Sequence, residues 1–237
     1  MLIAGFPAGP FGTNCYVAAT GPGSECVVID PGVGAAEGIA QIVAEHRLKP
    51  VAVLVTHGHA DHTFSVTPVA GTYDATAYIH PKDRPLLIDP MPAHSPEAAQ
   101  MLLGAGYSYA EPDNVVEIGD GATIDLAGLS FHVDHTPGHT LGSIIFRTPY
   151  ADATDISEVM FSGDLLFQGS IGRTDLPGGD HQAMMRSLRD KILPLGDDIA
   201  VLPGHGAQTS IGQERATNMF LQQLIDSGVS ANSARGH

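Results

Sequence analysis

The sequence predicts an α+β fold in which two packed mixed sheets lie between outer helices. Short apolar runs that end in Gly, His or Asp recur along the 237 residues, as expected for many strands joined by tight turns. In each half, several predicted strands are followed by strand–helix units, a pattern that favours a sheet-on-sheet core with helices outside. No linker-like composition break divides the chain, so we predict one domain over residues 1–226 and a disordered tail over residues 227–237, which are small and polar.

The elements of the first half follow from local patterns. Residues 16–20 and 26–30 flank a Gly-rich turn and predict a hairpin. Ala35–His46 carries apolar residues at helical spacing, which predicts a helix. Val51–Val55 is an unbroken apolar run and predicts a strand buried on both faces. We expect a short helix over residues 63–70, followed by a strand at residues 75–80.

The second half begins after an irregular, Pro-rich segment. We interpret residues 81–114 as a rim or lid with a helix near Glu97–Leu103. Polar and apolar residues alternate over Leu129–Val133, which predicts a half-buried strand. Asp180 is expected to be the N-cap of a helix that ends near Leu193. The remaining expected elements are strands at 115–118, 123–126, 143–148, 159–162 and 199–202, and a final helix at 211–226.

Composition excludes several classes of partner. The formal net charge is −15 and Trp is absent, so neither phosphate backbones nor stacked bases have an evident binding surface, and we predict no nucleic-acid partner. No apolar run approaches the ~18 residues that span a bilayer, which predicts no membrane association. With two cysteines, Cys15 and Cys26, and no secretory signal pattern, we expect reduced thiols and a cytoplasmic location. The oligomeric state stays open.

The most informative feature is a set of seven potential metal ligands. They are His57, His59, Asp61, His62, His139, Asp164 and His205. Four separate segments deliver them just past the carboxyl end of a predicted strand, and strand ends at one sheet edge converge in space. Imidazole suits zinc, iron and other first-row metals, while carboxylates can bridge two ions.

The set divides into two groups, each with a position left open for water or substrate. One ion takes His57, His59 and His139, the other takes Asp61, His62 and His205, and Asp164 bridges them. Two cations that share a water lower its pKa from ~16 towards ~7, which gives a nucleophilic hydroxide near neutral pH. We expect two divalent ions, zinc first, with iron or manganese as alternatives. The other seven histidines, His94 among them, lie outside this pattern and are expected to be structural.

These motifs resemble the metallo-β-lactamase superfamily, and most closely its small bacterial glyoxalase II-like (hydroxyacylglutathione hydrolase-like) branch. The resemblance rests on Thr13-Asn14-Cys15-Tyr16, Ile29-Asp30-Pro31-Gly32, Thr56-His57-Gly58-His59 with Asp61-His62, Thr136-Pro137-Gly138-His139-Thr140, Ser162-Gly163-Asp164, Gly172-Arg173-Thr174-Asp175 and Leu202-Pro203-Gly204-His205-Gly206. It implies an αββα sandwich with the seven ligands at one edge, so that residues 1–226 form a metallo-β-lactamase-like domain.

The resemblance also implies roles for two further residues. Asp30 resembles a family aspartate that supports the ligand loop from behind, although Asp-Pro-Gly is equally a simple turn after a strand. Arg173 falls where longer relatives carry a basic residue that contacts the carboxylate of the thiol carrier. It is therefore a candidate substrate-binding residue, with an ion pair to Asp175 or Asp180 as the alternative.

The implied reaction is hydrolysis of a small-molecule thioester, a hydroxyacyl-thiol conjugate, by a hydroxide that bridges the metals. Asp61 and Asp164 are the candidate catalytic carboxylates, with Asp61 orienting the hydroxide. A thiol pKa of ~8.5 makes the thiolate a tolerable leaving group without a dedicated acid. Alternatives are a persulfide dioxygenase with one iron held by two histidines and an aspartate, a lactonase or β-lactamase, and a non-enzymatic metal-binding module. A Ser–His–Asp hydrolase is disfavoured because no Gly-x-Ser-x-Gly surrounds Ser162.

Overall fold

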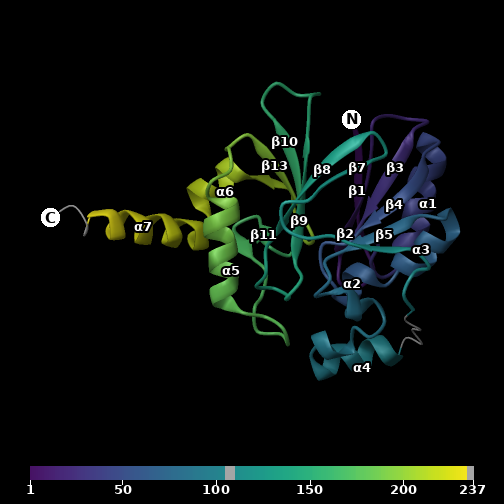
Figure 1. The fold of residues 1–237 in the computed structure, drawn as a ribbon, viewed down its shortest axis with the longest axis horizontal. Helices are drawn as coiled ribbons and strands as arrows, with labels where there is room; N and C mark the ends of the chain where they lie inside the picture. Colours follow the sequence, from purple (N-terminus) through teal and green to yellow (C-terminus); the bar gives the residue numbers. More distant parts are fainter. Residues whose placement is uncertain (105–109, 234–237) are drawn as a thin grey trace.

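The computed structural model describes residues 1–104 and 110–233, and these form two mixed six-stranded sheets with helices on both outer faces (Figure 1). The predicted α+β sandwich is confirmed. The first sheet has the order β1 (Leu2–Ala8), β2 (Thr13–Ala19), β3 (Glu25–Ile29), β4 (Lys49–Leu54), β5 (Thr76–Ile79), β6 (Val115–Glu117). The second has the order β14 (Thr209–Ser210), β13 (Ile199–Pro203), β10 (Glu158–Gly163), β9 (Ile144–Pro149), β8 (Leu129–His135), β7 (Thr123–Leu126). A small hairpin joins β11 (Leu166–Phe167) and β12 (Ser170–Ile171).

Alternating side chains on the first sheet build two apolar layers. In β2, Cys15 and Val17 point to the helical side, whereas Tyr16 and Ala18 point to the layer between the sheets. The β2–β3 hairpin is antiparallel, as predicted, and β3 to β6 then run parallel. Parallel strands buried on both faces carry continuous apolar runs. This explains the run at residues 51–55, of which residues 52–55 are fully buried.

The α-helices of the described ranges lie outside the two sheets. They are α1 (Ala35–His46), α2 (Ala60–Thr63), α3 (Val66–Tyr73), α4 (Pro96–Gly104), α5 (His181–Ser187), α6 (Ile211–Thr217) and α7 (Met219–Ser233). In Figure 1, α1 and α3 lie outside the first sheet and α5 and α6 outside the second. The predicted bounds of α1 are confirmed, and its fully buried Ile39 anchors the apolar face. The carboxylate of Asp180 accepts from the Ala183 N–H over 3.0 Å, which confirms the predicted N-cap of α5.

The structure differs from the sequence predictions in several places. Strand β1 was not predicted, and it pairs with β2 along its whole length. The predicted helix after Asp180 changes to a π-helical turn, η3 (Leu188–Ile192). The predicted final helix is divided at Asn218, which has an extended backbone (ψ 117°) and whose side-chain oxygen accepts from the Phe220 N–H at 3.1 Å.

The chain end also differs from the prediction. Helix α7 continues to Ser233, beyond the predicted end of the final helix at residue 226, and residues 234–237 of the predicted tail lie outside the described part. The small polar residues of this segment extend a helix that Leu221 anchors, fully buried, in the outer core of the second sheet. In Figure 1, α7 projects away from the sandwich.

The irregular segment between β5 and β6 forms one end of the molecule. It contains the short 3₁₀ helices η1 (Arg84–Leu87) and η2 (Met91–Ala93), followed by α4, which lies where the sequence predicted a helix. Within the described ranges, no helix has the length and hydropathy needed to cross a bilayer.

Candidate metal centre

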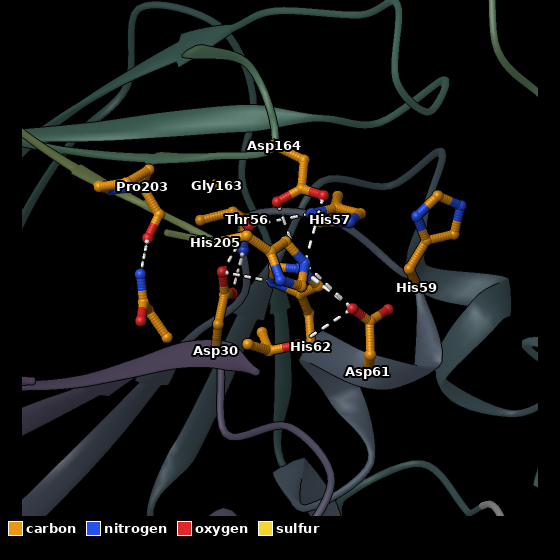
Figure 2. Close-up of polar contacts among 12 residues, drawn as sticks. Asp30, Thr56, His57, His59, Asp61, His62, Gly163, Asp164, Pro203 and His205 are labelled. Carbon is orange, nitrogen blue, oxygen red and sulfur yellow. Dashed lines mark hydrogen bonds and ion pairs between the residues drawn. The ribbon is translucent and has the colours of Figure 1, made fainter. Parts of the chain in front are cut away.

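The four ligand-bearing segments meet at one edge of the sandwich. Figure 2 shows the ligands of three of these segments, His57 to His62, Asp164 and His205. The four segments follow β4, β8, β10 and β13, so strands from both sheets deliver the ligands. Ligand atoms lie within 4.8 Å of one another in each of three groups: His57, His59 and His139; Asp61, His62 and His205; His57, His62 and Asp164. The first two groups are the partition that the sequence predicted.

Asp164 lies between the two groups. Its Oδ1 is 3.4 Å from Nε2 of His62, and its Oδ2 is 3.4 Å from Nε2 of His139. In the second group, Nε2 of His205 is 3.2 Å from Oδ2 of Asp61. Ligands at ~2.1 Å from a tetrahedral ion lie ~3.4 Å apart. The spacing therefore suits two neighbouring ions that share the Asp164 carboxylate.

Unpaired buried atoms provide a separate test of metal binding. Nε2 of His57, His59 and His139 and Oδ1 of Asp164 are buried, and none has a hydrogen-bond partner within the described part of the chain. Each such atom costs about 1–3 kcal/mol when it is left unmatched. Four of them around one centre fit divalent cations, which would use these lone pairs.

Asp30 fixes the orientation of two ligand imidazoles. Its Oδ1 accepts from the Thr56 N–H at 2.8 Å, and its Oδ2 accepts from the Thr56 hydroxyl at 2.6 Å and from Nδ1–H of His62 at 3.0 Å. Because the Thr56 hydroxyl gives its proton to Asp30, it accepts from Nδ1–H of His57 at 3.1 Å. Both rings therefore present a bare Nε2 to the centre. The supporting role implied for Asp30 agrees with this geometry, and the residue also makes the turn, with φ 49°.

A backbone carbonyl fixes the orientation of the His139 imidazole. Its Nδ1–H donates to the carbonyl oxygen of Arg173 over 2.7 Å, which leaves Nε2 bare. Hydrogen bonds of this kind fix the tautomer and raise the basicity of a metal-binding histidine. The Gly172-Arg173 stretch thus contributes to the centre through its main chain.

The electrostatics of the centre favour the protonation state that a metal requires at His57, His59, Asp61 and Asp164, whereas at His62 a bound metal would have to displace a proton. Burial and neighbouring imidazoles lower the pKa of His57 and His59, in His59 to about 3. Burial opposes ionisation of Asp61 and Asp164, yet nearby His62 lowers the pKa of both, that of Asp164 to about 2. Burial likewise disfavours protonated His62, but the Asp164 and Asp61 carboxylates raise its pKa well above the usual value. Ionised carboxylates and neutral imidazoles are the forms that bind metals.

A buried aspartate that the sequence did not single out holds the loops of the first group together. Asp83 is 1% exposed. Its Oδ2 accepts from the Gly58 N–H at 2.8 Å and from the Thr140 hydroxyl at 2.6 Å, and its Oδ1 accepts from the Gly142 N–H at 2.7 Å. It therefore joins the loop of His57 and His59 to the loop of His139.

Strand β2 ties the first sheet to the second group of ligands. The Thr13 hydroxyl donates to Oδ2 of Asp61 at 3.0 Å. The Asn14 side-chain amide donates to the carbonyl oxygens of Pro203 and Gly206, and the Tyr16 hydroxyl donates to that of Pro203 at 2.7 Å. The Thr13-Asn14-Cys15-Tyr16 motif was visible in the sequence, but this role in holding the His205 loop was not.

Close packing explains one glycine of the centre. A Cβ built on Gly204 would lie 2.2 Å from Oδ1 of Asp164 and 2.6 Å from Cε1 of His62. A side chain at this position would displace two ligands, so only glycine lets the His205 loop approach the centre.

A cavity of about 440 Å³ opens above the ligands. Its lining includes five of the seven ligands, the apolar residues Phe11, Ala98, Phe167, Ile171 and Leu176, and the polar residues His94, Ser95, Ser170 and Arg173. The Arg173 guanidinium, 60% exposed, also pairs with the Asp175 carboxylate through contacts of 2.7 and 2.8 Å. The ion pair is one of the two sequence interpretations of this arginine, and substrate binding, the other, stays a prediction for a residue that lines the cavity. His94, which we expected to be structural, lines the cavity as well.

Two known proteins are similar in sequence over most of this chain. A protein of Mycobacterium tuberculosis with the name "Uncharacterized protein" is 49% identical over 94% of this chain and 99% of its own length. The hydroxyacylglutathione hydrolase GloC of Haemophilus influenzae is 35% identical over 93% of this chain and 98% of its own.

Two solved structures are similar to this fold. The B3 metallo-β-lactamase BLEG-1 is 39% identical, with a TM-score of 0.78 over 93% of this chain and 99% of that chain. TTHA1623, solved in a di-iron-bound form, is 36% identical, with a TM-score of 0.73 over 92% of this chain and 100% of that chain. The model of the metallo-beta-lactamase superfamily matches residues 8–205, which span every ligand named above, and the chain therefore belongs to that superfamily.

Proposed function

We propose that this protein is a binuclear metallo-hydrolase that cleaves hydroxyacyl thioesters. The observation that carries the proposal is the pair of ligand groups joined by Asp164 at the floor of a cavity lined by apolar side chains and Arg173. The 35% identity to the hydroxyacylglutathione hydrolase GloC supports the substrate class.

The seven ligands would hold two divalent cations, zinc first, with iron or manganese as alternatives. The di-iron form of TTHA1623 supports iron as one of these alternatives. Bound cations of this kind supply a Lewis acid and a water whose pKa falls from ~16 towards ~7.

Side chains of the protein would orient the water, fix the separation of the ligand groups and bind the substrate. Asp61 stays ionised and accepts a hydrogen bond from the Thr13 hydroxyl on Oδ2, so its carboxylate can also accept a hydrogen bond from a nearby water and orient that water. Asp164 keeps one oxygen on each ligand group and so fixes their separation. The guanidinium of Arg173 would bind an anionic group of the thiol carrier, and the apolar wall around Phe167 and Leu176 would exclude water from the thioester.

The test is release of free thiol from a lactoyl thioester by protein loaded with zinc, iron or manganese. We expect turnover that stops when a chelator removes the metal and returns when the metal is added back. The same preparations are assayed with a lactone and a chromogenic β-lactam, because the name of BLEG-1 points to β-lactams. Thiol release no faster than with free metal, or unaffected by the chelator, would refute the proposal.

One observation favours a second candidate, a persulfide dioxygenase. His57, His62 and Asp164 form a group of two histidines and one aspartate, the ligand types expected for a single iron in such an enzyme. The approach of His205 to Asp61 favours a second ion and therefore hydrolysis. Oxygen uptake by the iron-loaded protein with glutathione persulfide, in the absence of thioester cleavage, would decide for the dioxygenase.

We also propose a cytoplasmic location and a small-molecule substrate in place of a nucleic-acid partner. The two thiols, Cys15 and Cys26, are free and buried, which suits a reducing compartment. The net charge of −15 disfavours contact with phosphate backbones.

A further inference from the structure

A histidine outside the ligand set lines the same cavity. His94 lies between η2 and α4 and forms one wall of the cavity with Ser95 and Ala98. Its ring centroid is 5.1 Å from that of His59, with 45° between the ring planes. The imidazole of His94 is therefore next to the first group of ligands, close to any substrate that reaches the metals.

A backbone contact sets the tautomer of His94. The Ala60 N–H donates to Nε2 of His94 over 2.9 Å. A ring nitrogen that accepts a hydrogen bond carries no proton, so the neutral imidazole carries its proton on Nδ1. Because Ala60 lies between His59 and Asp61, the same contact ties His94 to the metal-binding loop and fixes the direction of the ring.

The Nδ1–H group is a donor without an acceptor among the described residues. No hydrogen bond reaches it from the residues that the structure describes, and it is not among the unpaired atoms that are closed off from solvent. The space that His94 lines is the cavity. An acceptor supplied by a substrate is the partner that this donor lacks.

The two polar groups on the cavity wall suit different parts of a thioester. The Arg173 guanidinium is cationic and suits a carboxylate of the thiol carrier. A neutral imidazole donor suits an uncharged oxygen, and the α-hydroxyl of a hydroxyacyl group is such an oxygen, next to the reacting carbonyl. The position of His94 beside His59 places its donor near the acyl end.

We propose that His94 determines acyl specificity by donating from Nδ1 to the hydroxyl oxygen of the substrate's acyl group. This inference rests on the proposed thioester hydrolysis. A neutral hydrogen bond of this kind changes a rate or equilibrium constant about tenfold. His94 would accordingly favour hydroxyacyl over plain acyl thioesters by about that factor.

The experiment compares two thioesters of one thiol, the lactoyl and the propionyl ester, which differ by a single oxygen. The ratio of their kcat/KM values is measured for the zinc-loaded wild type, His94→Phe and His94→Asn. We expect His94→Phe to lower the ratio about tenfold, through the lactoyl ester alone. His94→Asn should keep most of the ratio, because its amide nitrogen can take the place of Nδ1. His181→Phe, an exposed histidine at the start of α5, is the matched control and should leave the ratio unchanged.

A spectroscopic readout tests the tautomer without catalysis. Two-bond ¹H–¹⁵N spectra are recorded for the zinc-loaded wild type and for zinc-loaded His94→Phe. The imidazole signals that are present in the first spectrum and absent from the second belong to His94, and we expect their pattern to be that of the Nδ1–H tautomer. An Nε2–H form would overturn the inference. Thioester turnover with the same ratio in His94→Phe and wild type would overturn it while the proposed function stands. No turnover of either ester by the wild type would refute the proposed function and this inference with it.

Discussion

Replacement of Asp83 by Asn is expected to weaken metal binding without removing a ligand. Both oxygens of Asp83 accept hydrogen bonds, from Gly58 and Thr140 on one and from Gly142 on the other. An amide keeps a single acceptor oxygen, so at least the Gly142 N–H would face an NH₂ group instead. A hydrogen bond to a charged group contributes about 1.5–3 kcal/mol.

The magnitude follows from this loss and from one opposing effect. Burial raises the pKa of Asp83, so a neutral amide recovers part of the cost of burying the charge. We therefore expect the free energy of unfolding to fall by about 2 kcal/mol, which lowers Tm by about 4–8 °C in a chain of this size. Loosening the loops of His57 and His139 should weaken zinc binding about 10–100-fold, as for other residues that orient metal ligands.

The assay is a competition titration of zinc against a fluorescent chelator, together with thermal unfolding of the metal-free and zinc-loaded protein. The matched control is Asp125→Asn on exposed β7, which should change neither quantity. Zinc affinity of Asp83→Asn within twofold of the wild type would show that the two loops hold their geometry without this carboxylate.

Three further predictions address the ligands, the cavity and the thiols. His59→Ala should lower thioester kcat/KM at least about 100-fold with an unchanged far-UV circular dichroism spectrum, and near-wild-type turnover would show that the metals are incidental. Arg173→Ala should raise KM more for carboxylated than for neutral thioesters, whereas equal effects would leave only the ion pair with Asp175. Burial raises the pKa of Cys15 well above its usual value and that of Cys26 to about 12, so a thiol reagent at pH 8 should label neither until denaturant is added. Labelling of the native protein at pH 8 would contradict the burial of these thiols. The thiols of the unfolded chain ionise near pH ~8.5 and those of the folded chain at higher pH, so their contribution to the free energy of unfolding should decline as pH rises above about 9.

Elements that depend on local patterns were predictable from the sequence. The bounds of α1 follow from its apolar periodicity, and the strand at residues 51–55 follows from its continuous apolar run. The division of the last helix was not predictable, because it depends on a distant contact. The Asn218 side chain donates to the carbonyl of Ser170, 48 positions away in sequence.

The candidate site likewise contains residues that a local pattern predicts and residues that depend on distant contacts. Four ligands crowd into the six residues from His57 to His62, a density that points to metal on its own. Asp83 meets its partners 25, 57 and 59 positions away, and His94 meets Ala60 from 34 positions away. An isolated Asp or His in a Pro-rich segment carries no local sign of such contacts, so only the folded chain reveals these two residues.

The supports of the two ligand groups are not equivalent. Among the described residues, the Asp83 carboxylate bonds only to the loops that carry the first group, through Gly58, Thr140 and Gly142. Asp30 holds His62 of the second group directly and His57 of the first group through Thr56. A change at Asp30 therefore alters both groups at once, and Asp164 joins them again on the opposite side. Because the tautomers are set by these protein contacts, the fold itself prepares the bare nitrogens, and the two ions would enter a site whose halves are already coupled.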